Sequence, residues 1–295
     1  MNSVLDEILK EARKAGAGNV HLTVNCPPVM RIGQKIEKMK FPALTATDTL
    51  NIILYVMNEA QREEFETRGE AEVAFTAADG GRCRISAYKQ GHLAALAVRI
   101  LKEQIPSLTE LGAMEQAGEF CKKRQGFVVV TGGSGCGKTT TIAALIREIN
   151  ESEQRMILTI ERPVEYLHEN KNSVVIQREI GTDAESAAAA LKAAVREDMD
   201  VIVVSEVEDA QTLNALLTAV ETGHLVFAEL PAADIAGAVE ELTALYPESE
   251  RALLKARLSR VPFAVVAQRF AIEEEGSRTT AQFKVLKNKL WDQAL

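Results

Sequence analysis

FVVVTGGSGCGKTTT, at residues 127–141, is the stretch of sequence that decides the fold. Its four leading apolar residues predict a buried strand, and the eight-residue pattern GxxxxGKT follows at 132–139. Apolar residues then recur at helical spacing, at Ile142, Leu145, Ile146 and Ile149. A strand, a glycine-rich loop and a helix in this order are typical of a P-loop (Walker A motif), in which backbone N–H groups surround phosphate oxygens. The stretch therefore predicts an α/β domain that binds a nucleotide, which we expect to be ATP.

Each part of this loop has an expected task. Its glycines permit backbone conformations with positive φ and bring N–H groups close to phosphate oxygens, while Cys136 is expected to contribute its backbone alone. Lys138 can reach the β- and γ-phosphates, and the Thr139 hydroxyl can ligate Mg²⁺. The alternative is a glycine-rich turn with a surface lysine, which the coincidence of strand, motif and helix disfavours. The expected nucleotide-binding residues are Gly132, Gly133, Ser134, Gly135, Cys136, Gly137, Lys138, Thr139 and Thr140.

Two carboxylates follow predicted strands of the same domain. Glu206 comes just after the apolar run 201–204, so we expect it at the carboxyl end of a strand, where open α/β sheets bind ligands. There it would activate water and partner Mg²⁺, the alternative being an exposed loop carboxylate. Glu161, after the strand-like residues 156–160, is a second candidate acid. His224 precedes a predicted strand, and spacing leaves it open between a site residue and a capping or packed histidine.

The sequence pattern changes along the chain. Residues 1–103 mix helical periodicity with alternating strands and predict a small α+β domain, which includes a helix with Thr47 as a candidate N-cap. Residues 104–112 carry breaker residues without periodicity and are the predicted linker. Residues 113–295 alternate short apolar runs with helical patterns, which predicts a mostly parallel sheet covered by helices. The predicted fold class is a two-domain α/β protein.

The composition excludes several classes of protein. Hydrophobic residues make up 46% and charged residues 26% of the 295, which argues against a disordered or fibrous chain. The net charge of −8 supplies no general attraction for nucleic acid, so we expect no such partner. No apolar run reaches the roughly 18 residues of a spanning helix. The four scattered cysteines form no CxxC pair, so we expect a cytoplasmic protein without a zinc site or disulfides.

Six motifs in order carry a resemblance to a known family. They are NVHL (19–22), RCRIS (82–86), TGGSGCGKTTT (131–141), LTIERPVEYLH (158–168), LKAAVREDMDVIVVSE (191–206) and ETGHLVFAEL (221–230). The set resembles the PilT-like branch of the type II/type IV secretion ATPases, from the N-terminus to about residue 288. The P-loop alone occurs in many families, whereas its combination with the last two motifs is specific. The resemblance implies a PAS-like N-terminal domain, a RecA-like P-loop domain, and ring-shaped hexamers with nucleotide between neighbouring subunits.

The same resemblance implies roles for five residues. Arg84 and Arg99 match the family's phosphate-contacting arginines and would neutralise charge on the γ-phosphate. Without the resemblance, two solvated strand arginines would be an equally good interpretation. Glu206 matches the Walker B glutamate, Glu161 the glutamate of the aspartate box, and His224 the first histidine of the histidine box.

The chain also departs from the family pattern. Arg162 stands where the aspartate box has its aspartate, Pro231 where the histidine box has a second histidine, and Ser205 where Walker B has a glycine. Proline offers neither a side-chain donor nor a backbone N–H. The chain stops at Leu295, so we expect most of the family's C-terminal helical region to be lacking. These departures predict slow hydrolysis.

The leading hypothesis is a hexameric ATPase that drives type IV pilus retraction and twitching motility. It would lie in the cytoplasm, peripheral at the inner membrane, and act through an inner-membrane platform protein. The alternative is a weakly active or inactive nucleotide-binding accessory subunit, in a mixed ring with a second retraction ATPase. A small-molecule kinase or DNA translocase would keep the P-loop but leave the N-terminal resemblance unexplained.

Overall fold

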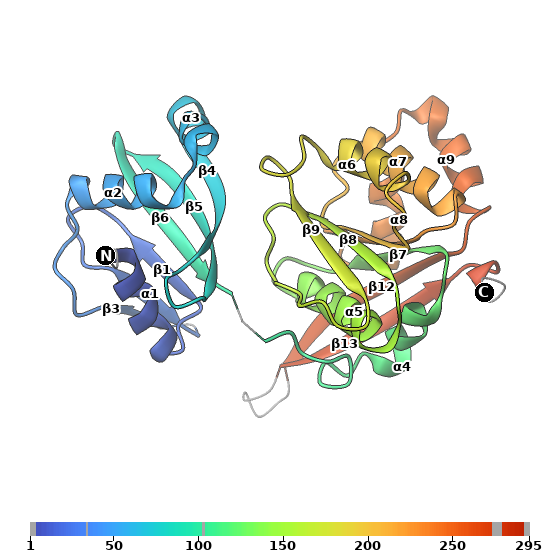
Figure 1. Ribbon diagram of the computed structural model, residues 1–295, viewed down its shortest axis with the longest axis horizontal. Coiled ribbons are helices and arrows are strands. Elements are labelled where there is room, and N and C mark those ends of the chain that lie inside the picture. The colour runs from blue at the N-terminus through green and yellow to red at the C-terminus, as the bar shows by residue number, and fades with distance from the viewer. Residues whose placement is uncertain (1–3, 34, 102–103, 273–278, 292–295) are drawn as a thin grey trace. The chain divides into compact units, whose positions relative to one another are not determined.

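The chain forms two compact units in a computed structural model (Figure 1). The structure describes residues 4–33, 35–101, 104–272 and 279–291. The first unit comprises Met1–Gln104 with Glu165–Leu167, and the second comprises Ile105–Val164 with His168–Leu295. The division after Gln104 falls at the start of the predicted linker 104–112, and residue 103, the predicted end of the first domain, lies outside the described residues.

An antiparallel sheet and three helices make up the described part of the first unit. The elements are α1 (Val4–Lys14), β1 (Asn19–Leu22), β2 (Val29–Ile32), β3 (Lys35–Lys38), α2 (Ala46–Val56), α3 (Glu59–Arg68), β4 (Glu70–Thr76), β5 (Arg82–Gln90) and β6 (Leu93–Ile100). The strands pair in the order β3-β2-β1-β6-β5-β4, and each neighbouring pair is antiparallel.

Alternation along β5 shows how this sheet buries one face. Cys83, Ile85 and Ala87 are buried in a core that α1, α2 and α3 share. The residues between them, which include Arg84 and Ser86, point to the other face and are only half-buried. Successive side chains of a strand point to opposite faces, so the sequence RCRISA at 82–87 places its two arginines on one face and Cys83, Ile85 and Ala87 on the other.

Two helices of this unit differ from the sequence-based expectation. The N-cap of α2 is Thr45 and not Thr47, because Thr45 and Asp48 form a capping box. The Thr45 hydroxyl accepts a hydrogen bond from the Asp48 N–H at 3.2 Å, and the Asp48 carboxylate accepts one from the Thr45 N–H at 2.8 Å. Helix α3 was not predicted because it lacks apolar periodicity, and Phe65 is its buried residue.

The second unit contains a larger sheet with helices on both faces. Its described elements are α4 (Met114–Ala117), the 3-10 helix η1 (Gly118–Lys122), β7 (Gly126–Thr131), α5 (Lys138–Ser152), β8 (Met156–Glu161), β9 (Val174–Glu179), α6 (Ala187–Ala194), β10 (Val201–Val204), α7 (Ala210–Glu221), β11 (Leu225–Leu230), α8 (Ile235–Ala244), η2 (Glu248–Glu250), α9 (Arg251–Leu258), β12 (Phe263–Ile272) and β13 (Thr279–Lys287). The strand order is β13-β12-β7-β11-β10-β8-β9, and every pair is parallel except β12–β13.

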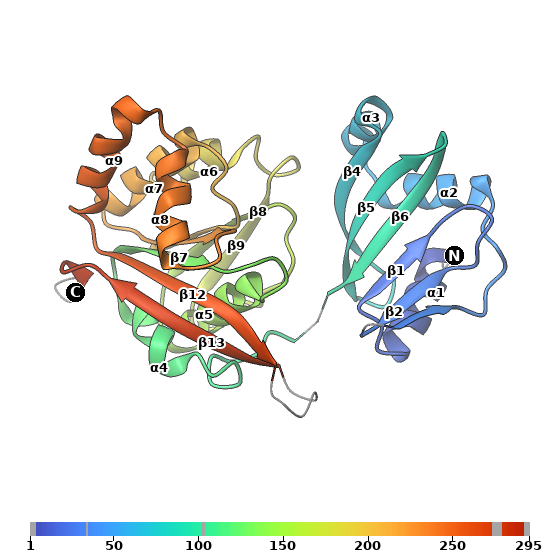
Figure 2. The ribbon, with the colours of Figure 1, turned by 180° about the vertical axis from the view of Figure 1, so that it is seen from behind.

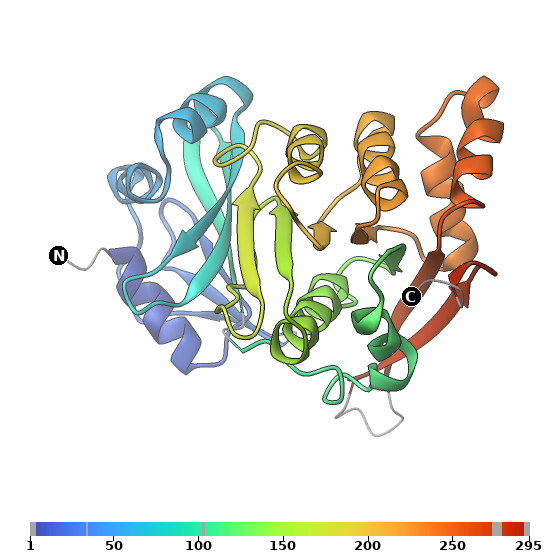
Figure 3. The ribbon, with the colours of Figure 1, turned by 45° about the vertical axis from the view of Figure 1, so that its right-hand side comes forward.

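Two apolar cores lie on the two faces of this sheet. One core joins the strands to α6, α7, α8 and α9, and the other joins them to α4, η1 and α5. Figure 1 shows these two helical layers above and below the strands. Figure 2 shows the β12–β13 hairpin in red along one side of the sheet, and Figure 3 shows β9 and β8 at the other side. The strands predicted at 127–130, 156–160 and 201–204, and the strand predicted after His224, correspond to β7, β8, β10 and β11, which lie side by side.

No helix in the described ranges is both long enough and apolar enough to cross a membrane. Within the same ranges, Cys26, Cys83, Cys121 and Cys136 are free thiols.

Two of these thiols should resist alkylation. Burial raises the pKa of Cys83 and that of Cys121 to about 12, so about one in 10⁴ of either is thiolate at pH 8. Cys26 is only half-buried. We expect iodoacetamide to label Cys26 in the folded protein, and Cys83 and Cys121 only after unfolding, as peptide mass spectrometry can measure. Equal labelling of Cys83 and Cys26 in the folded protein would contradict this burial.

Candidate nucleotide-binding site

The P-loop connects β7 to α5, as the sequence predicts. Gly135 and Gly137 have φ of 73° and 90°, and Gly137 is the N-cap of α5. Both conformations are ones that side-chain-bearing residues rarely adopt. The helix begins at Lys138, and the Thr141 N–H donates to the Gly137 carbonyl at 2.9 Å. The amino end of the 15-residue helix α5, a site of positive potential, therefore lies directly at the P-loop.

Gly132 occupies a place that no larger residue can take. A Cβ built there would collide with the backbone carbonyl oxygen of Gln268 and with the Cys136 sulfur. At Gly133 a Cβ would meet nothing within 4 Å, so the close approach is specific to Gly132. The loop thus packs against β12 at its first residue. It forms a cradle lined by backbone, which fits the binding of phosphate oxygens through N–H groups.

Gln268 holds the loop from β12. Its side chain is 3% exposed, its Nε2 donates to the Cys136 carbonyl at 2.6 Å, and its Oε1 accepts from the Thr141 hydroxyl at 2.6 Å. One amide group therefore fixes both the loop and the first turn of α5. Sequence reasoning missed this residue, although a glutamine that ends the apolar run 263–267 is a polar group that needs buried partners.

Lys138 and Thr139 lie in the first turn of α5. The Lys138 ammonium donates to the carbonyls of Gly132 at 3.0 Å and Gly133 at 3.3 Å, so its side chain folds back along the loop. The Thr139 hydroxyl donates to a carboxylate oxygen of Glu229 at 3.3 Å. Glu229 lies on β11 and was not predicted as a site residue, although an acid inside the apolar stretch LVFAEL is a visible signal.

The parallel strands bring their carboxyl ends to the same edge of the sheet as the loop. The register aligns Glu229 of β11 with Val130 of β7, and Val204 of β10 with Ile160 of β8. Glu161, the last residue of β8, and Glu206, two residues beyond β10, therefore end at this same edge. This is the edge where ligands of open α/β sheets bind.

The two predicted acids differ in exposure. Glu161 is 8% exposed, and its carboxylate accepts hydrogen bonds from the Thr159 hydroxyl at 2.6 Å and the Gln177 amide at 3.3 Å. Glu206 is exposed. Arg162 follows Glu161, and its backbone N–H donates to the Ser205 hydroxyl at 3.3 Å while its side chain is exposed. Of these two acids, Glu206 is therefore the one that is exposed to solvent.

His224 is not brought to the loop within this chain. It precedes β11, whose six residues span roughly 20 Å, whereas the loop follows the far end of the parallel strand β7. Its Nδ1 lies 2.8 Å from the carbonyl oxygen of Ala219, near the end of α7. Since a carbonyl only accepts, Nδ1–H donates, and the ring contacts the last turn of that helix.

Arg84 and Arg99 lie in the first unit, directly opposite each other. They are register partners on β5 and β6, on the face away from the core. The Arg84 side chain forms an ion pair with Glu72 of β4. Two like charges directly opposite each other on neighbouring strands repel. Arg84 and Arg99 thus place two cationic side chains next to each other on this sheet, and Arg84 is paired with Glu72.

Comparisons with known proteins decide the family. The sequence profile described as "Type II/IV secretion system protein" matches residues 1–291. The chain belongs to the type II/IV secretion system protein family. Curated members of this family similar to it include the type IV pilus retraction ATPase PilT of Pseudomonas aeruginosa, 34% identical over 94% of this chain and 80% of that protein. The type IV pilus ATPase PilU of the same organism is 32% identical over 96% of this chain and 74% of that protein.

A solved structure of this family has the same fold. The pilus retraction motor PilT with bound ADP superposes with a TM-score of 0.89 and 36% sequence identity, over 98% of this chain and 84% of that one. The predicted α/β class, with an N-terminal domain followed by an ATPase domain, is thereby confirmed, as is the resemblance to the PilT-like secretion ATPases.

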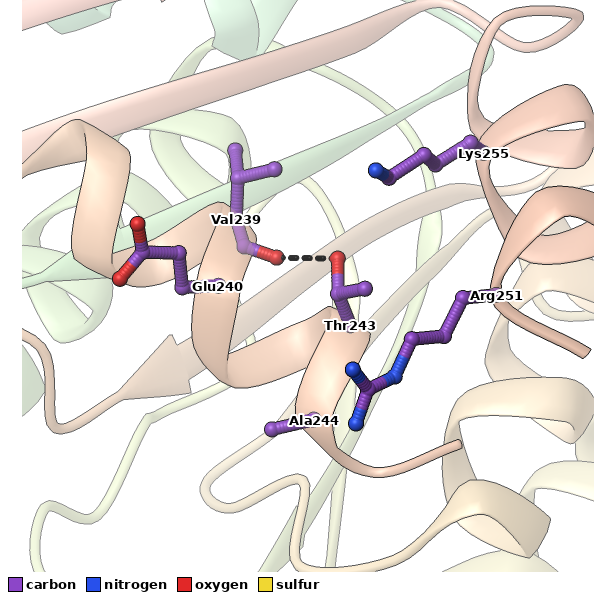
Figure 4. A pocket seen from close by; sticks show the side chains of 6 residues that line it. All are labelled: Val239, Glu240, Thr243, Ala244, Arg251 and Lys255. Atoms are coloured by element: carbon purple, nitrogen blue, oxygen red, sulfur yellow. Dashed lines mark hydrogen bonds between the residues drawn. The ribbon is translucent and has the colours of Figure 1, made fainter. Parts of the chain in front are cut away.

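A separate pocket lies between α8 and α9 (Figure 4). Its lining residues are Val239, Glu240, Thr243, Ala244, Arg251 and Lys255. The Thr243 hydroxyl donates to the Val239 carbonyl at 2.6 Å, and Arg251 Nε donates to the carbonyl of Tyr246 at 3.1 Å. The pocket contains no residue of the P-loop or of the acidic strand ends, so it is separate from the nucleotide site.

Proposed function

We propose that this family member is an ATP-hydrolysing motor subunit of a type IV pilus machine, acting in pilus retraction. The observation that carries the proposal is the P-loop itself, whose Gly132 cradle, Lys138 and Thr139 come together at the carboxyl edge of the sheet. The names of the relatives, a retraction ATPase and a retraction motor with ADP, supply the nucleotide and the biological process. Residues 132–140 bind the phosphates through backbone N–H groups, and Lys138 offsets their charge.

Catalysis is assigned to groups at the strand ends. Glu206 orients a water molecule and accepts its proton while the water oxygen attacks the γ-phosphorus and the bond to the ADP oxygen breaks. Thr139, with Glu206 as an outer partner, would hold Mg²⁺, since such sites use one or two protein ligands and the phosphates. The bound cation would draw charge from the phosphate oxygens. Glu161 supports this edge through its contacts with Thr159 and Gln177.

Assembly completes the site in this proposal. Arg84 and Arg99 belong to a unit without a P-loop, and we assign them to the γ-phosphate held by a neighbouring subunit of a hexamer. The ring would act at the cytoplasmic face of the inner membrane on a platform protein. His224 stays a prediction of the family resemblance, since its contacts in this chain are those of a helix end.

Activity should depend on contacts between subunits. Specific ATPase activity of the wild-type protein should rise steeply with protein concentration, in step with its mass by light scattering. Arg84→Ala and Lys138→Ala proteins should each be inactive alone. Mixed in equal amounts they should recover activity, since about a quarter of the interfaces in random rings would then carry both intact residues. Full activity of a monomer, or no recovery in rings shown to be mixed, would refute the shared site.

A second function is favoured by two residues. Arg162 places a cation beside Glu161 at the strand ends, and Pro231, just beyond β11, has no donor. These features support an accessory subunit with weak or no hydrolysis, which would work in a ring with a complete retraction ATPase. The relative named PilU has the same level of identity as PilT. Turnover that appears only when a complete retraction ATPase is added would select this function over the first.

A further inference from the structure

We infer that Glu229 is a positioning residue for Thr139, the expected Mg²⁺ ligand of the P-loop, and that it couples nucleotide binding to the cation. This inference rests on the proposed nucleotide-binding function. It concerns an acid that lies neither in the P-loop motif nor at the end of β10.

The strand order places Glu229 beside the loop. β11 is the parallel neighbour of β7, and the register pairs Glu229 with Val130, two residues before Gly132. Val130 and Phe227 belong to the core on the α5 face of the sheet. Because parallel register partners point the same way, and residues two apart on a strand share a face, the Glu229 side chain points to that face as well. The first turn of α5, with Thr139, is what it meets there.

The hydrogen bond from Thr139 to Glu229 orients the Thr139 hydroxyl for binding a cation. A hydroxyl that gives a lone pair to a cation must direct its proton elsewhere. The Thr139 hydroxyl already donates to Glu229 Oε2 at 3.3 Å, so its proton is directed away from its lone pairs, which can serve another partner. A carboxylate acceptor fixes the hydroxyl rotamer and makes the oxygen a stronger donor of electron density, as acceptors behind metal ligands generally do. Glu229 thus acts through Thr139 and need not touch the cation or the substrate.

The negative charge of Glu229 also affects how nucleotide and cation bind together. A negative group this close to the loop repels phosphates when no cation is present and attracts the cation when one is. Glu229 should therefore weaken metal-free nucleotide binding and strengthen the Mg²⁺-dependent part. Coupling of this kind between two ligands is a free energy that can be measured without turnover. A residue that served only the packing of β11 would affect both kinds of binding equally.

The test uses a fluorescent ADP analogue and the full chain. Binding is measured in EDTA and across a Mg²⁺ titration for wild type, Glu229→Gln and Glu229→Ala, with Glu240→Gln as the control. Glu240 is an exposed acid on α8, away from Thr139. We expect Glu229→Ala to raise the Mg²⁺ midpoint by about 10-fold or more while ADP affinity in EDTA stays equal or improves. Glu229→Gln, which keeps an acceptor but loses the charge, should fall between wild type and Glu229→Ala.

Each other outcome overturns the inference in a distinct way. An unchanged Mg²⁺ midpoint in Glu229→Ala, with an unchanged circular dichroism melt, means that Thr139 does not depend on Glu229. A lower midpoint means that Glu229 holds Thr139 away from the cation. Equal loss in EDTA and in Mg²⁺ assigns Glu229 to structure alone. If wild type fails to bind ADP in either condition, the proposed function itself is wrong, whereas intact wild-type binding with any of the preceding results removes only this inference.

Discussion

Lys138→Ala should lower ATP affinity by at least about 100-fold and abolish turnover, without unfolding the protein. The Lys138 ammonium lies against the Gly132 and Gly133 carbonyls, at the concave side of the loop. From there it supplies a full positive charge to the phosphates. Hydrogen bonds to charged groups contribute about 1.5–3 kcal/mol each, so losing two costs at least about 3 kcal/mol, or about 100-fold in affinity.

The fold should tolerate this change. Lys138 is half-buried, and its ammonium group contacts the backbone of the loop. Binding can be measured by fluorescence of an ATP analogue, with thermal melting as the test of folding. Lys255→Ala is the matched control, because Lys255 is an exposed lysine in the pocket between α8 and α9. Wild-type affinity in Lys138→Ala would refute the P-loop assignment.

Glu206→Gln should reduce hydrolysis by about 10²-fold or more and leave ATP affinity within a few-fold of wild type. A glutamine keeps the size and an acceptor oxygen of the side chain but cannot accept a proton from water at neutral pH. Loss of a general base acts on the transition state, so the rate falls while binding is retained. The exposure of Glu206 at the strand ends agrees with access to water.

The neighbouring acid Glu208 provides a control for the effect of Glu206→Gln on hydrolysis. Glu208 is also exposed and lies two residues further along the same loop. Glu208→Gln should hydrolyse ATP at the wild-type rate in the same phosphate-release assay. If Glu206→Gln and Glu208→Gln are both as active as wild type, Glu206 is the exposed loop carboxylate of the alternative interpretation. If Glu206→Gln loses binding and turnover together, its carboxylate serves the binding of the nucleotide.

The parts of the site that could be predicted from the sequence are those whose residues are neighbours in the chain. The P-loop residues are neighbours in the chain, and their spacing alone implies a strand, a loop and a helix. The family and the α/β class followed from such motifs, and the comparisons confirm both. The roles of Glu206, Glu161, Arg84 and Arg99 stay predictions, because no contact within one chain reports on chemistry at a bound phosphate.

The parts that sequence could not predict depend on strand order. Gln268 follows the loop by more than a hundred residues and reaches it only because β12 lies beside β7. Glu229 reaches Thr139 only because β11 lies on the other side of β7. His224 is the opposite case. The residues around it resemble a site motif, but it precedes β11 and therefore lies at the amino end of that strand, away from the P-loop. Periodicity identifies strands but not which of them become neighbours.

The hydrogen bonds of Gln268 to the P-loop and α5 can form only after most of the second unit has been synthesised. The ribosome makes the P-loop long before it makes β12, so a growing chain carries the whole motif while the group that fastens it does not yet exist. During that interval the Cys136 carbonyl and the Thr141 hydroxyl lack the partner that they have in the finished fold. The fastening of the loop by Gln268 therefore arrives late in synthesis, when β12, the last parallel strand, is inserted beside β7. It belongs to the completed sheet, and a nascent chain that stops short of residue 268 carries the P-loop motif without this side-chain contact.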